Sequence, residues 1–214
     1  MSKHSLALLL VPLGLMAGQD LKPVALPTPQ TTGGKPLMQA LKERKSVREF
    51  GPEQLSRQVL SNLLWAAWGI NRDDGRRTAP SASNRQEIDV YAIMAEGAYV
   101  YDAKANALKP VTRTDLRKLA GTQAYVADAA VNLIYVADTS TLGGDEAGKL
   151  ATANADTGFI AENAYLFCAS EGLAVVVRGS VDRAALGKAL NLRAEQRIIL
   201  AQSVGYPKKS GAGR

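Results

Sequence analysis

Arg44, Lys45, Ser46 and Arg48 place three cations and one hydroxyl within five consecutive positions. A guanidinium can make paired charge-assisted hydrogen bonds, an ammonium acts as a point charge, and a hydroxyl adds a short neutral hydrogen bond. This set of groups suits the binding of a phosphate. Basic residues at a helix end also interact favourably with the helix dipole, so an ordinary solvated helix end is the alternative.

A second group of polar side chains lies in a long loop, residues 69–86. Loops of this length in a compact domain are usually functional or mobile. Small side chains let the backbone approach a ligand, and hydroxyl and amide groups offer the donors and acceptors that the edge of a heterocycle requires. An ordinary turn rich in Ser and Asn is the alternative. The candidate ligand-binding residues of this loop are Pro80, Ser81, Ala82, Ser83, Asn84 and Gln86.

The chain is poor in residues that catalyse reactions without a cofactor. Its one cysteine is Cys168, and its one histidine, His4, lies close to the N-terminus. These counts exclude Ser-His-Asp and Cys-His nucleophiles, an internal disulfide and conventional zinc sites from the folded region. An enzyme without a metal would therefore need an organic cofactor as its reactive centre. The net charge of +6 suits an anionic ligand, a nucleic acid or an acidic membrane surface equally well.

Hydrophobic periodicity predicts the elements that would position these groups. A helix is expected to end at Arg44, and Ser56 is expected to cap the helix that precedes the polar loop. The pattern predicts an α+β or α/β domain with one sheet and helices on both faces. The expected helices are 36–43, 56–68, 114–120, 145–172 and 182–190, and the expected strands are 87–94, 99–103, 107–111, 130–137, 173–177 and 196–204.

The two ends of the chain differ in composition from the middle. Residues 1–20 carry Lys3 and His4 before an apolar run, 6–17, that is too short to span a bilayer comfortably. This predicts a secretory signal, a periplasmic or secreted protein, and no stable membrane anchor after cleavage. A docked N-terminal arm on a cytoplasmic protein is the alternative. Residues 21–35, rich in Pro, Gly and Thr, are predicted to be a linker, 36–209 a single domain and 210–214 a flexible tail.

Several motifs together resemble those of FMN-dependent nitroreductases. The run 44–50, Arg-Lys-Ser-Val-Arg-Glu-Phe, resembles the family's Arg-Arg-Ser-x-Arg-x-Phe signature. Further similarities are Pro80 to Asn84, Glu162 to Ala164 in an Ala/Gly-rich helix, Arg178-Gly179 after a strand, and the ending Val204 to Lys208. The resemblance covers residues 36–209. It implies an α+β fold with a mixed, mainly antiparallel sheet flanked by helices, and a homodimer holding FMN at its interface.

The resemblance also implies how the phosphate of FMN would be bound. Arg44 and Ser46 would bind the phosphate directly, and Lys45 would support them. Lys208 or Lys209 would approach the same phosphate from the C-terminal tail.

For the flavin ring, the resemblance places Arg48 near the pyrimidine edge. A cation there stabilises the reduced, anionic flavin and raises its reduction potential. Ser83 and Asn84 would hydrogen-bond the N3/O4 side of the ring. The backbone N–H of Arg178 or Gly179 would face N5, the atom that accepts hydride.

The implied activity is a two-electron, ping-pong exchange at flavin N5. NADH or NADPH would deliver hydride, and a small oxidant such as a nitroaromatic or a quinone would remove it. Neither a catalytic side chain nor a metal is required. An FMN-binding protein without nicotinamide turnover and an exported flavin-dependent dehydrogenase or oxidase are alternatives. A basic module that binds nucleic acid is disfavoured, because few aromatic residues accompany the Lys/Arg clusters.

Overall fold

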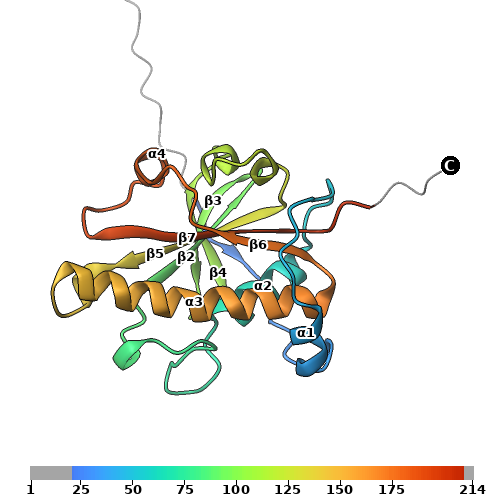
Figure 1. The fold of residues 1–214 in the computed structure, drawn as a ribbon, viewed down its shortest axis with the longest axis horizontal. Helices are drawn as coiled ribbons and strands as arrows, with labels where there is room; N and C mark the ends of the chain where they lie inside the picture. The colour runs from blue at the N-terminus through green and yellow to red at the C-terminus, as the bar shows by residue number, and fades with distance from the viewer. Residues whose placement is uncertain (1–20, 210–214) are drawn as a thin grey trace, which may run out of the picture.

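A computed structural model describes residues 21–209. The predicted signal segment, 1–20, and the predicted tail, 210–214, lie outside the described residues. Figure 1 shows one sheet with helices on both sides. In chain order the strands are β1 (Val24–Ala25), β2 (Ile88–Met94), β3 (Gly97–Asp102), β4 (Ala107–Thr112), β5 (Val131–Asp138), β6 (Ala174–Arg178) and β7 (Gln196–Gly205), and the α-helices are α1 (Leu37–Glu43), α2 (Arg57–Trp68), α3 (Glu146–Glu171) and α4 (Arg183–Ala189).

The seven strands follow the order β1-β4-β3-β2-β5-β7-β6, and each pairing among them is antiparallel. The predicted α+β class is confirmed. In the centre, Ile134 of β5 pairs with Tyr91 of β2 on one side and with Ala201 of β7 on the other. Both faces of β5 are covered, which explains why its sequence is almost continuously apolar.

Alternation along the strands sends side chains into two separate cores. Leu133 and Tyr135 pack with α2 and α3 on one face, whereas Ile134 and Val136 pack on the other. The second face is covered by α4 and by two short 3₁₀ turns, η2 (Arg117–Leu119) and η3 (Ala124–Ala127). In Figure 1, α4 and these turns lie above the sheet and α3 lies below it.

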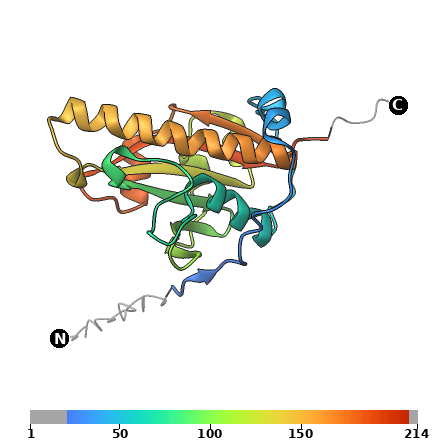
Figure 2. The same cartoon turned by 90° about the horizontal axis from the view of Figure 1, so that it is seen from below.

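Helix α3 confirms the predicted long helix. The Asp145 side chain caps its first turn by accepting from the Gly148 N–H at 2.8 Å, and Gly172 ends it with a φ of 70°. At 1.5 Å per residue, a helix of 26 residues is about 39 Å long. Figure 2 shows it running along the domain, with α1 near its C-terminal end. It can therefore contact segments that are far apart in the sequence.

The predicted cap of α2 is also confirmed, because Ser56 Oγ accepts from the Val59 N–H at 3.2 Å. Trp68 is buried in the core, where its indole N–H donates to the Ile88 carbonyl at 2.7 Å. Trp65 is half-buried, and its indole N–H donates to the Ile70 carbonyl. No helix within residues 21–209 is both long and apolar enough to cross a membrane.

The segment 21–35, predicted to be a linker, packs against the domain instead. Val24 pairs with Leu108 of β4, and Leu26 is buried. The Asn106 side chain donates to the Pro27 carbonyl at 2.8 Å. The prediction is wrong because the segment needs no core of its own: it completes an open sheet edge and satisfies its backbone groups there.

The helix predicted over 114–120 reduces to the 3₁₀ turn η2. Asp115 Oδ1 accepts from the Arg117 N–H at 3.0 Å, and the two side chains form an ion pair. An acidic side chain that binds the backbone two residues ahead offers an alternative to helical hydrogen bonds. This local competition limits the turn to three residues.

Candidate active site

The basic segment 44–48 leaves α1 and runs along the edge strand β6. The Val47 N–H donates to the Val175 carbonyl at 2.9 Å. Successive side chains of an extended chain point to opposite sides. Lys45 and Val47 line a cavity of about 550 Å³, which Lys35 and Lys42 also line. Ser46 instead contacts α3, so the motif is divided between two surfaces.

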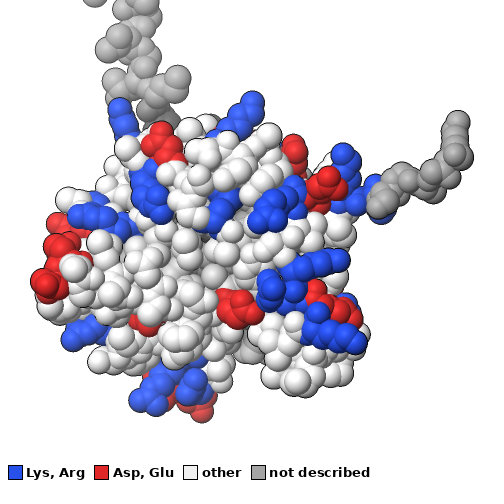
Figure 3. All heavy atoms as spheres, viewed as in Figure 1, with Lys and Arg blue, Asp and Glu red and all other residues white. Residues whose placement is uncertain are grey.

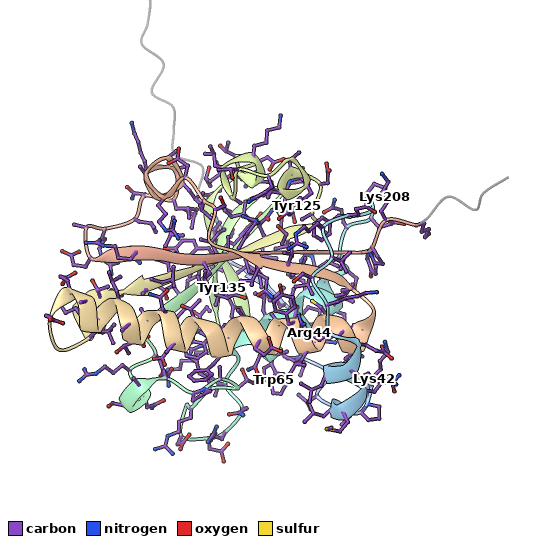
Figure 4. All side chains as sticks on the ribbon, viewed as in Figure 1. Lys42, Arg44, Trp65, Tyr125, Tyr135 and Lys208 are labelled. Atoms are coloured by element: carbon purple, nitrogen blue, oxygen red, sulfur yellow. The ribbon has the colours of Figure 1, made fainter. Side chains whose placement is uncertain are left out.

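Tyr165 of α3 gathers the groups on the other surface. Its hydroxyl lies 2.8 Å from Ser46 Oγ and accepts from the Val177 N–H at 2.8 Å. The Arg44 guanidinium carbon lies 5.3 Å from the centroid of the same ring, within cation–π range. Figure 4 shows Arg44 against the C-terminal half of α3. One tyrosine thus holds both residues that are expected to bind a phosphate directly.

Sequence reasoning did not single out Tyr165, although a signal existed. The residue falls on the buried stripe of α3 that includes Ala161, Ala164 and Cys168. A tyrosine in such a stripe needs a hydrogen-bond partner for its hydroxyl. Its partners could not be named, because Ser46 is 119 residues away in the chain.

The cations of this segment lack neutralising partners within residues 21–209. Arg44, Lys45 and Arg48 make no ion pair with any described residue. Ser46 is exposed. Figure 3 shows Lys and Arg side chains gathered on the side of the molecule that carries α1 and the end of the described chain, with Asp and Glu between them. The segment can therefore accept an anion.

The C-terminal tail runs beside the same segment. Phe50 and Pro207 form an antiparallel bridge, and the Lys208 N–H donates to the Glu49 carbonyl at 3.1 Å. Lys209 Nζ lies 3.4 Å from Glu53, in an exposed ion pair. The fold thus brings the backbone of the tail lysines next to residues 44–50.

The loop that contains Pro80 to Gln86 has an unusual backbone. Ser83, Asn84 and Gln86 have φ values of 52°, 53° and 52°. Non-glycine residues in this left-handed region cost roughly 1–3 kcal/mol each and persist only where the surroundings hold them. The Ala82 N–H donates to Asp156 Oδ2 of α3 at 2.8 Å, which is one such restraint. Most of the loop is exposed, and Ser81 is half-buried.

The Gln86 side chain supports this loop from within. Its carbonyl accepts from Arg77 Nε at 2.7 Å, and its amide donates to the Gly75 carbonyl at 3.1 Å and to Asn84 Oδ1 at 3.0 Å. Arg77 also donates to the Trp68 carbonyl and lies 4.7 Å from the centroid of that indole. The Gln86 side chain therefore bonds other residues of this loop, whereas the sequence prediction expects it to contact a ligand.

Two buried carboxyl groups lie beneath the loop. Glu87 is 3% exposed and Asp156 is 4% exposed. Both oxygens of Glu87 lack a hydrogen-bond partner among the described residues. Burial, and then the neighbouring Asp156, raise the pKa of Glu87 to about 7. The neighbouring Asp156 thus favours the protonated form of Glu87, and Asp156 also accepts from the loop.

At the end of β6 the prediction concerns only the backbone N–H of Arg178 or Gly179, and the structure buries the Arg178 side chain. The Arg178 guanidinium turns into the second core, where it donates to the Ala120 carbonyl, to Asn132 Oδ1 at 2.7 Å and to Ser203 Oγ at 2.8 Å. Burial lowers the pKa of Arg178 to about 10. Gly179 follows immediately and is exposed. Of Arg178 and Gly179, therefore, the backbone and not the arginine side chain is available to a ligand at the end of β6.

Segment 44–48 runs along β6 and meets Val177 through Tyr165, whereas the tail at 207–208 pairs with Glu49 and Phe50 beyond the other end of the segment. The structure holds loop 80–86 at a different position on α3. Asp156 and Tyr165 are separated by about 14 Å along the α3 axis at 1.5 Å per residue. The candidate residues therefore form two groups that contact α3 at different places, one at Tyr165 and the other at Asp156.

Comparisons with known proteins identify the family of this chain. The model of the nitroreductase family matches residues 41–206. A structure from Ralstonia eutropha JMP134, provisionally named a nitroreductase, has a TM-score of 0.84 and 39% identity, with 88% of this chain and 90% of that chain covered. A protein from Methanocaldococcus jannaschii, also provisionally named a nitroreductase, is 29% identical over 67% of this chain and 78% of its own length.

A more distant structure shares the fold. It is the NADPH:FMN oxidoreductase of Vibrio harveyi complexed with NAD+, with a TM-score of 0.61, 20% identity, and coverage of 83% of this chain and 71% of that one. The family match includes the basic segment, the strained loop, Tyr165 and the end of β6. This chain belongs to the nitroreductase family, whose members are flavin-dependent oxidoreductases.

Proposed function

We propose that the protein binds FMN and transfers two electrons, as hydride, from NADH or NADPH to a small organic acceptor such as a nitroaromatic or a quinone. The observation that carries the proposal is the arrangement around Tyr165. Arg44 and Ser46 are held on one side chain, and Arg44 has no acidic partner among the described residues. The name of the Vibrio harveyi relative supports FMN as cofactor and a nicotinamide as donor.

The residues present fit FMN in their chemistry. Arg44 and Ser46 would hold the phosphate, and Lys208 is the nearest candidate from the tail because its backbone pairs with Glu49. Lys45 would act only at longer range, because it lines the neighbouring cavity with Lys35 and Lys42. An uncompensated cationic surface of this kind suits a dianionic group.

The flavin ring would be bound by exposed groups, some of which lie in the restrained loop 80–86. Ser83 and Asn84 are exposed in a strained loop, with Pro80, Ser81 and Ala82 shaping its entry. Arg48 would stabilise negative charge on the ring, and the backbone of Gly179 would donate to it. The Gln86 side chain is not expected to contact the ring, because its amide group already bonds Arg77 and Gly75.

When bound, FMN supplies the hydride acceptor and donor that this chain lacks. The one histidine, His4, lies outside the described residues, and Cys168 is buried, with burial raising the pKa of its thiol. The side chains named above therefore bind, orient and stabilise charge. None of them needs to transfer a proton.

We further propose that the active unit is a homodimer. One face of α3 exposes Leu150, Ala151, Ala155, Gly158 and Phe159, at the spacing of a helix stripe. Phe159 is 49% exposed, and on α1 Leu37 and Met38 are 63% and 75% exposed. Apolar stripes of this kind mark interfaces, and a second copy would enclose a phosphate site that is open in one chain.

The dimer can be tested with Phe159→Asp. A carboxylate in the centre of the proposed interface should convert the protein to a monomer in light scattering and weaken FMN binding at least about tenfold. Ala184→Asp, on exposed α4 beyond the other face of the sheet, is the matched charge control. A Phe159→Asp protein that stays dimeric would contradict this interface.

The cofactor and the activity are tested by the visible spectrum of purified protein, before and after anaerobic addition of NADH or NADPH. Bleaching of the flavin band supports the proposal. Protein that is colourless and cannot be reconstituted would overturn it. Flavin that dithionite reduces but nicotinamides do not would support the second candidate, an FMN-binding protein without nicotinamide turnover.

Two variants separate the roles of the arginines. Arg44→Ala should lower FMN affinity about 10- to 100-fold and yield largely apo protein, because a charge-assisted contact is lost. Arg48→Ala should keep the colour and lower the midpoint potential. Full FMN occupancy in Arg44→Ala would refute the phosphate assignment.

The periplasmic or secreted location remains a prediction from residues 1–20. Sequencing the N-terminus of protein expressed from the full chain tests it. Cleavage near residue 20 is the expected result, and an intact N-terminus on cytoplasmic protein would contradict it.

A further inference from the structure

Tyr165 is almost fully buried, at 5% exposure, and its hydroxyl has two polar neighbours among the described residues. One is the backbone N–H of Val177, and the other is Ser46 Oγ, each at 2.8 Å. The hydroxyl therefore sits between a strand of the sheet and the exposed side chain of the basic segment. The hydroxyl proton of Tyr165 can point towards only one of these two neighbours.

The direction follows from the donors and acceptors. A backbone N–H can only donate, so the Val177 proton points at the tyrosine oxygen. The tyrosine proton then has one acceptor within reach, Ser46 Oγ. The opposite direction, with Ser46 donating inward, would leave a buried hydroxyl proton without an acceptor, at a cost of about 1–3 kcal/mol.

The proton of Ser46 is consequently left to donate outward. Ser46 is exposed, so this proton can meet a ligand. Phosphate oxygens are acceptors, and a donor whose own oxygen already accepts a hydrogen bond is polarised in the favourable sense. The Arg44 guanidinium is kept over the face of the same ring, 5.3 Å from its centroid.

We propose that Tyr165 is a positioning residue for phosphate binding: it sets a one-way hydrogen-bond relay from the Val177 N–H through its hydroxyl to Ser46, and it holds Arg44 beside the end of that relay. This inference rests on the proposed function. It adds Tyr165, a residue outside the basic motif, as the group that orients the hydroxyl proton of Ser46.

The test compares FMN with riboflavin, which lacks the phosphate. Each is titrated into deflavinated protein, and the dissociation constant is measured by flavin fluorescence. Tyr165→Phe should weaken FMN about tenfold, because the Ser46 proton is no longer directed at the phosphate, and leave riboflavin unchanged. Ser46→Ala should do the same. The double variant should lose little more than Ser46→Ala alone, because both changes interrupt one relay.

Tyr135→Phe is the matched control, since it removes another buried tyrosine hydroxyl, one that bonds Gln202. It should leave the ratio of the FMN and riboflavin constants unchanged. A purely structural role for Tyr165 would weaken both flavins equally, and that result would overturn the relay.

The relay would also be overturned if Tyr165→Phe bound FMN like the wild type. If Tyr165→Phe does not fold, the exposed Ser46→Ala variant still decides, because unchanged FMN affinity there would remove the end of the relay. Wild-type protein that binds neither flavin would overturn the proposed function itself. Wild-type protein that binds FMN and is reduced by a nicotinamide keeps that function standing, whichever way the relay is decided.

Discussion

Helix α3 holds the basic segment 44–48 and the loop 80–86 in contrasting ways. At Tyr165 it uses a neutral hydroxyl, and the segment it holds also gains a backbone bond from Val47 to β6. At Asp156 it uses a carboxylate, and the loop it holds contains three left-handed non-glycine residues. Residues 44–48 have no left-handed backbone conformation, whereas the attachment at Asp156 restrains a loop against its own backbone preference.

The contrast extends to charge. At Tyr165 the Arg44 guanidinium lies over the ring, and no carboxylate neutralises it among the described residues. Around Asp156 a second carboxyl, Glu87, is buried without a hydrogen-bond partner in the described part of the chain. The attachment of the loop at Asp156 should therefore respond to pH and to mutation more strongly than the attachment of the basic segment at Tyr165.

The largest effect is expected from Asp156→Ala. It removes the charge-assisted bond to the Ala82 N–H and releases the strained loop, so we expect the free energy of unfolding to fall by about 2–4 kcal/mol in urea titrations. Relief of repulsion on Glu87 will offset part of this loss. Asp156→Asn keeps an acceptor and should recover most of the stability. A loss below about 0.5 kcal/mol would show that the loop does not depend on this contact.

The next effect is a pH dependence that Glu87 should impose. Its pKa is raised in the folded state from an ordinary value of 4.5 to about 7, so the folded state favours the protonated form. Its stabilising contribution is complete below about 4.5 and is lost as the pH rises through about 7.

Glu87→Gln should remove this slope, so that the variant gains roughly 1–3 kcal/mol over the wild type at alkaline pH and little at acidic pH. Urea titrations of both proteins across the pH range provide the measurement. Equal slopes would mean that Glu87 ionises normally in the fold.

A smaller effect on the unliganded protein is expected from Tyr165→Phe. Water can replace the phenol at exposed Ser46, and only the Val177 N–H loses its partner, so about 1 kcal/mol of stability should be lost. The loss should not vary with pH. A loss as large as that of Asp156→Ala would erase the contrast between the two attachments.

The smallest expected effect is the coupling free energy between the attachments at Asp156 and Tyr165. Asp156 and Tyr165 share no partner, so Asp156→Ala and Tyr165→Phe should add to within about 0.5 kcal/mol in the unliganded protein. A larger coupling, measured by a double-mutant cycle on unfolding, would mean that α3 transmits strain between the two attachment sites.

Local patterns predicted much of this molecule. The apolar spacing of α2 and α3, the Ser56 cap and the strands β2 to β7 depend on residues close together in the sequence, and the structure confirms them. The family motifs identified the fold class and the family. The prediction failed for 21–35, because a sheet edge orders that segment, and for 114–120, where a local side-chain bond competes with a helix.

The sequence by itself determined which chemical groups are available: a cluster of cations with a hydroxyl, a loop of small polar residues, and no histidine beyond His4. Only the tertiary structure decided which groups meet. Ser46 bonds a tyrosine 119 residues away, Ala82 bonds a carboxylate 74 residues away, and Arg178 turns into the core. Hydrogen-bond direction and pKa depend on which atoms lie within a few ångströms, and chain folding alone brings such distant atoms together.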